Sequence, residues 1–133
     1  MKEIQNILNS TLPFVEILLK EYGEFYPLAS VVNLDEKVEQ ITNFNGNDIE
    51  FPESTSVLEN LKNHLRTKSN NFLAIAIFYN VRVKEDETDA VAVFVEDKIE
   101  NSAFTFYYAY KIDKKELIFG NSWKTLVPKE IFI

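Results

Sequence analysis

Tyrosine and carboxylate side chains carry most of the chemistry that this sequence offers. The chain of 133 residues has no cysteine and a single histidine, His64. Disulfides, thiolate nucleophiles and cysteine-based metal sites are therefore excluded, and one imidazole argues against a histidine-based triad or a multi-histidine zinc site. Three scattered glycines form no phosphate-binding loop. We expect no metal and no cofactor, and we assign no residue a catalytic role.

Glu24 is the carboxylate with the most suggestive neighbours. It lies among Tyr22, Phe25 and Tyr26, directly after the first expected helix. Partial burial beside a phenol would suit a carboxyl group for general acid catalysis, whereas an exposed Glu24 next to packed aromatic rings is the commoner arrangement. Glu24 and Tyr26 are therefore the candidate residues for a pocket between the sheet and the helices, with Tyr108 as a further polar group.

The charge of the chain narrows the classes of partner. Lysine and arginine number 14 against 21 acidic residues, which gives a net charge of −7, and the basic residues are scattered. We therefore expect neither nucleic acid nor an anionic membrane as a partner. A basic protein would suit such a surface, although the charge also serves solubility. No stretch approaches the ~20 apolar residues of a membrane span, and none resembles a signal peptide, so we expect a cytoplasmic protein.

Hydrophobic spacing predicts two helices and about six strands in one α+β domain over residues 1–133. The first helix ends at Gly23 and should kink or break at Pro13, and the second spans residues 54–68. The expected strands are 28–33, 37–42, 72–83, 89–96, 102–111 and 116–120. Short turns favour a single antiparallel sheet, in the order α-ββ-α-ββββ, and we place both helices on one face.

One expected strand carries an aromatic stripe. Its members alternate along the chain and so share a face: Phe104, Phe106, Tyr108 and Tyr110. Such a stripe usually packs beneath helices as part of the core. Left uncovered, it would instead offer a protein interface, where aromatic side chains are enriched.

The strand at 72–79 is apolar on both of its faces. Helices on one face would leave the other exposed, and apolar patches of several hundred Å² usually mark an interface. Either the C-terminal stretch 127–133 covers this face or another protein chain does. The candidate interface residues are Phe78, Tyr79, Tyr107 and Tyr108.

Three segments carry a resemblance: KEYGEFYPLA at 20–29, YNVRV at 79–83 and TDAVAV at 88–93. They look like segments of a family of small uncharacterised bacterial proteins. Those proteins resemble, in size and acidity, the immunity proteins that neutralise bacterial toxins. The likeness spans most of the chain, but its motifs are structural and name no chemistry. It implies a bacterial, cytoplasmic setting.

The sequence thus supports three hypotheses. The first is a non-enzymatic protein-binding module, whose partner is a toxin-like protein or a second copy in a homodimer. The second is a small-molecule-binding domain or an enzyme that uses carboxylate and tyrosine groups in a pocket. The third is a self-associating structural domain without a ligand.

Overall fold

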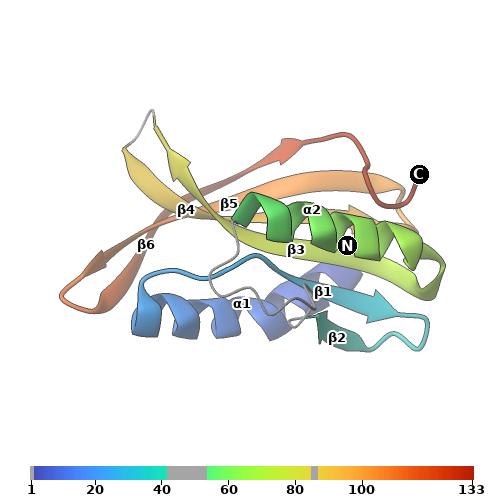
Figure 1. Ribbon diagram of the computed structural model, residues 1–133, viewed down its shortest axis with the longest axis horizontal. Helices are drawn as coiled ribbons and strands as arrows, with labels where there is room; N and C mark the ends of the chain where they lie inside the picture. The colour runs from blue at the N-terminus through green and yellow to red at the C-terminus, as the bar shows by residue number, and fades with distance from the viewer. Residues whose placement is uncertain (1, 42–53, 85–86) are drawn as a thin grey trace.

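The computed structural model describes residues 2–41, 54–84 and 87–133 of the chain. A single six-stranded antiparallel sheet in the order β2-β1-β3-β4-β5-β6 forms the centre of the molecule (Figure 1). Its strands are β1 (Leu28–Asn33), β2 (Val38–Ile41), β3 (Phe72–Val83), β4 (Thr88–Asp97), β5 (Ser102–Asp113) and β6 (Glu116–Leu126). With helices α1 and α2, these strands confirm the predicted α+β class and the order α-ββ-α-ββββ. The connection between β2 and α2 lies outside the described residues.

Helix α1 (Lys2–Tyr22) is continuous through Pro13, so the predicted break does not occur. Proline cannot donate a hydrogen bond to the carbonyl group four residues earlier, which belongs to Asn9. Both Pro13 and Asn9 are exposed, so water can satisfy that carbonyl group. The helix ends where the sequence predicts. Gly23 has a positive φ of 73°, and its N–H donates to the Leu19 carbonyl oxygen at 2.9 Å, as in a glycine C-cap.

The two helices cover opposite faces of the sheet, so the expectation that they share one face is wrong. Helix α1 packs on one face with a set of fully buried residues: Ile4, Ile7, Val15 and Leu19. Helix α2 (Ser54–Thr67) packs on the other with Val57, Leu61 and Leu65. Alternate residues of β3 enter the two resulting cores, Ala74, Ala76 and Phe78 on the α1 face and Ile75 and Ile77 on the α2 face. Cover on both sides explains why β3 is apolar on both of its faces.

The C-terminal tail (residues 127–133) covers a further part of the α2 face. Ile131 is 1% exposed and joins the core beneath α2. The carboxylate of Glu96 is fully buried and accepts three consecutive backbone hydrogen bonds, from Glu130 at 2.7 Å, Ile131 at 2.8 Å and Phe132 at 3.1 Å. Of the two covers proposed for this face, the C-terminal stretch is therefore present.

Strand β6 forms one edge of the sheet and is longer than predicted. It continues past Gly120 to Leu126 because the register shifts between Tyr108 and Tyr110 of β5, which accommodates a bulge. Ile118, Phe119 and Leu126 are between 40% and 80% exposed along it. No helix in the described part of the chain is long and apolar enough to cross a membrane.

Candidate functional site

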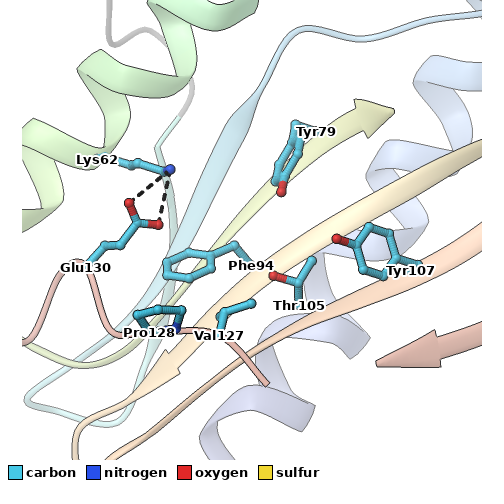
Figure 2. A pocket seen from close by; sticks show the side chains of 8 residues that line it. All are labelled: Lys62, Tyr79, Phe94, Thr105, Tyr107, Val127, Pro128 and Glu130. Carbon is cyan, nitrogen blue, oxygen red and sulfur yellow. Dashed lines mark hydrogen bonds and ion pairs between the residues drawn. The ribbon is translucent and has the colours of Figure 1, made fainter. Parts of the chain in front are cut away.

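A pocket of about 430 Å³ opens on the α2 face, between α2, the sheet and the C-terminal tail (Figure 2). Its lining residues are Lys62 from α2, Tyr79 from β3, Phe94 from β4, Thr105 and Tyr107 from β5, and Val127, Pro128 and Glu130 from the tail. The volume falls in the range of small-molecule sites, which are typically apolar and aromatic with a few polar groups. This pocket is the candidate functional site.

Strand register places the two tyrosines of the pocket on either side of a small residue. Tyr79 of β3 and Tyr107 of β5 both lie opposite Ala92 of β4, so the three side chains form one row on the α2 face. In the neighbouring row Phe94 lies opposite Thr105. The short side chain of Ala92 leaves space between two large rings, and helix α2, which lies mainly over β1 and β3, does not fill it.

Three hydroxyl groups face the pocket without a hydrogen-bond partner in the described part of the chain. Those of Tyr79, Thr105 and Tyr107 make no hydrogen bond to any described residue, and Figure 2 shows the two phenol oxygens turned toward the interior of the site. Burial raises the pKa of Tyr79, and the neighbouring Tyr107 and Glu130 raise it further. The Tyr79 phenol is therefore protonated at neutral pH and can both donate and accept a hydrogen bond.

The charged groups of the pocket are paired with each other. Lys62 Nζ lies 3.2 Å from a carboxylate oxygen of Glu130, at the end of the pocket away from the tyrosines (Figure 2). The same ammonium group lies 5.8 Å from the centre of the Phe94 ring. Arg66 Nε donates to the backbone carbonyl oxygen of Glu130 at 2.7 Å and so fixes the position of that residue. The formal charges of the lining cancel.

An aromatic stack extends the site toward the edge of the sheet. Tyr107 and Trp123 of β6 lie opposite each other, with ring centres 5.3 Å apart and ring planes inclined by 16°. Both side chains are half-buried. Trp123 is the single tryptophan of the chain, so its fluorescence reports on the neighbourhood of the pocket.

The four predicted interface residues divide between the two faces of the sheet. Tyr79 and Tyr107 lie together in the pocket wall. Phe78 is fully buried beneath α1, and Tyr108 packs against the same core. The assignment of Phe78 to an interface is therefore corrected, because its side chain is fully buried beneath α1. Tyr108 is half-buried, and its assignment to an interface stays a prediction. The aromatic stripe of β5 packs against the α1 core, as the commoner alternative predicted.

Glu24 and Tyr26, the predicted pocket residues, are exposed and lie outside the lining of this pocket. Glu24 acts electrostatically on Tyr110, whose hydroxyl donates to Asn80 Oδ1 at 2.8 Å. Burial raises the pKa of Tyr110, the hydrogen bond to Asn80 lowers it, and the charges of Asp89 and Glu24 raise it. The pocket on the α2 face is therefore built from residues other than the two predicted ones.

Sequence reasoning missed Lys62, Phe94, Thr105 and Glu130 as site residues. From the sequence, Lys62 is indistinguishable from a solvent-facing helix residue. Glu130 belongs to the C-terminal tail, whose path depends on tertiary contacts. Glu96 did carry a usable signal, because a carboxylate next to a run of buried apolar strand residues requires partners. In the described part of the chain, no three histidine or acidic side chains lie close enough together to hold a metal ion.

No protein-family model, no curated protein and no solved structure matches this chain. The fold and the pocket define an α+β protein with a six-stranded antiparallel sheet between two helices.

Proposed function

We propose that this protein is a non-enzymatic binding module that takes a protein partner on the α2 face, around the pocket. The observation that carries the proposal is the group formed by Tyr79, Tyr107 and Trp123, half-buried aromatic residues beside a preformed hollow on a part of the sheet that α2 leaves open. Aromatic residues around a pocket are typical of the energetic centres of protein interfaces. The pocket lining contains no histidine, and its carboxylate is paired with Lys62.

The net charge of −7 supports a basic partner, because complementary charge accelerates encounter and excludes acidic competitors. The resemblance to immunity-like proteins is in keeping with a toxin-like partner in a bacterial cytoplasm. A second copy of the chain is the alternative protein partner. In either case the aromatic residues would supply the binding energy, and the surface charge would govern the rate of association.

The test compares capture of partners by the wild-type protein and by Tyr107→Ala and Trp123→Ala. Tyr22→Ala is the matched control, because Tyr22 is 69% exposed and lies at the end of α1. A stoichiometric partner should be retained by the wild type and by the control. Loss of a central aromatic side chain should weaken the purified complex about 30-fold in calorimetry. Light scattering, run in parallel, identifies a second copy as the partner.

Circular dichroism distinguishes a loss of binding from a loss of folding. Tyr107→Ala and Trp123→Ala should both retain the spectrum of the folded protein. A partner that binds both variants as tightly as it binds the wild type would contradict the proposed site. So would the lack of any stoichiometric partner and of any dimer. An affinity that does not change with salt concentration would contradict only the basic character of the partner and would leave the proposed site intact.

Binding of a small molecule in the same pocket is the second candidate function. It is favoured by the volume of about 430 Å³ and by the three hydroxyl groups that lack partners among the described residues. A flat protein-binding surface does not require polar groups inside a pocket, whereas a small-molecule site uses such groups to orient its ligand. The two candidates share one site, and they differ in whether the occupant is free or part of a polypeptide.

A further inference from the structure

The walls of the pocket favour a flat occupant. Three aromatic rings contribute to it, those of Tyr79, Phe94 and Tyr107, and Val127 and Pro128 of the tail add an apolar wall. Phe94 is 4% exposed, so its ring is fixed in place by the surrounding core. Rings of this kind offer flat apolar faces against which another ring can stack or pack edge to face.

The polar groups favour an occupant with hydrogen-bonding atoms at its edge. The hydroxyl groups of Tyr79, Thr105 and Tyr107 have no partner in the described chain, and each can donate one hydrogen bond and accept others. Thr105 is 3% exposed, so the surrounding core fixes its side chain in the pocket wall. A hydrocarbon in the pocket would leave these groups without partners, which is unfavourable.

The charge of the lining favours an uncharged occupant. Lys62 and Glu130 neutralise each other at 3.2 Å, and Glu130 is also held by Arg66 through its backbone. A charged molecule would have to break this pair or enter the pocket without a counter-charge, and both are unfavourable in a partly buried site.

We infer that the pocket binds an uncharged, flat ring that carries hydrogen-bond donors and acceptors on its edge. This inference rests on the proposed function only in taking the pocket as the binding site. The same chemistry has two sources, a free heterocycle and the aromatic side chain of a bound polypeptide. The ring would pack between the walls formed by Tyr79 and Tyr107 and bond to the three hydroxyl groups.

The experiment measures the affinity of defined probes for the full chain by calorimetry and by the fluorescence of Trp123. Uracil represents a free heterocycle, and N-acetyl-tyrosinamide represents an aromatic side chain of a polypeptide. Toluene tests a flat ring without polar atoms, and benzoate and benzylammonium test the two signs of charge. We expect at least one of the first two probes to bind about tenfold more tightly than the other three.

Variants that remove a hydroxyl group but keep the shape of the side chain test its role. Tyr79→Phe, Tyr107→Phe and Thr105→Val should each weaken binding of the preferred probe about fivefold, the effect of one lost hydrogen bond. Tyr108→Phe is the matched control, because Tyr108 is next to Tyr107 on β5 but lies on the α1 face. Its affinity for the probe should equal that of the wild type.

Three results would overturn the inference: no binding of uracil or N-acetyl-tyrosinamide at millimolar concentration, tighter binding of a charged probe, or equal binding of toluene. These results are separate from a failure of the proposed function. If a protein partner depends on Tyr107 while no ring probe binds, only the inference about the ring fails. If uracil binds and no protein partner exists, the protein-binding proposal fails and a small-molecule site remains.

Discussion

Glu96 shows how one residue decides the path of a whole segment. Its side chain is fully buried at the end of β4, and it accepts hydrogen bonds from three successive backbone N–H groups of the tail, between 2.7 and 3.1 Å. A carboxylate that accepts several backbone hydrogen bonds forms charge-assisted bonds, which are stronger than neutral ones. The tail in turn supplies Val127, Pro128 and Glu130 to the pocket.

We expect Glu96→Gln to release the tail and to lower the free energy of unfolding by about 2–3 kcal/mol. The amide keeps one acceptor oxygen but places an NH₂ donor against backbone donors, and it removes the charge that strengthens the bonds. Urea denaturation measures the loss, and hydrogen exchange should show faster exchange at the amides of residues 130–132. Glu116→Gln, on exposed β6, is the control and should change stability by less than about 0.5 kcal/mol. Unchanged protection of the tail amides would contradict the role assigned to Glu96.

At the scale of elements, α1 stays helical through Pro13 although the helix lacks the backbone hydrogen bond that a residue with an N–H group would donate there. Pro13 lies inside the helix and is exposed, while Ile4, Ile7, Val15 and Leu19 of the same helix are fully buried against the sheet. Packing of this apolar face holds the helix together across the proline, since tertiary contacts supply most of the stability of a protein helix. A buried hydrogen bond of 2.6 Å between the Thr11 and Ser30 hydroxyl groups ties this part of α1 to β1.

We expect Pro13→Ala to stabilise the protein by about 2 kcal/mol. Proline in a helix interior is about 3 kcal/mol less favourable than alanine, and part of that gain is lost because proline also restricts the unfolded chain. Thermal and urea unfolding measure the change. Asn6→Ala, on the exposed side of the same helix, controls for helix propensity and should give only about 0.5 kcal/mol. A destabilised Pro13→Ala would mean that the proline is required by the packing of α1.

At the scale of the whole molecule, burial on the two faces of the sheet raises the pKa of three tyrosines. Burial is the largest cause that raises the pKa of Tyr79, Tyr108 and Tyr110 above the ordinary value of 10.0. Tyr79 lies in the pocket on the α2 face, and the other two lie on the α1 face. The unfolded chain therefore loses these protons at a lower pH than the folded chain does. Their contribution to stability is complete below about pH 10 and is lost as the pH rises through the folded pKa values.

We expect stability to fall above pH 10, and Tyr108→Phe should reduce that fall. Tyr108 is the suitable position because Tyr110 also donates a hydrogen bond to Asn80. Urea denaturation between pH 8 and about pH 11 measures the slope of stability with pH. Tyr22→Phe removes a phenol that is 69% exposed and should leave the slope unchanged. An equal slope for the wild type and Tyr108→Phe would contradict the effect of burial.

Element type and order followed from local patterns. Predicted and observed β3 share the bounds Phe72–Val83, and α1 ends at Tyr22, directly before Gly23, because periodicity and glycine capping act between neighbours in the chain. The end of β6 was missed, since its bulge depends on the register with β5 rather than on its own residues. The prediction that both helices lie on one face of the sheet was also wrong. The pattern of an amphipathic helix specifies which of its sides is buried but not which face of the sheet it covers.

By itself, the sequence determined the α+β class, the excess of apolar strand surface and the small set of chemical groups available, mainly tyrosines and carboxylates. Only the tertiary structure decided which of these groups meet. Tyr79 and Tyr107 are 28 residues apart in the numbering of the chain, and pairing of both with Ala92 brings them to one pocket. Phe78 and Tyr108 precede or follow them by one residue and lie on the opposite face, beneath α1. Since side chains alternate across a strand, neighbouring residues of β3 and β5 lie on different faces of the sheet, and the segments that pack on each face decide which aromatic residues line the pocket.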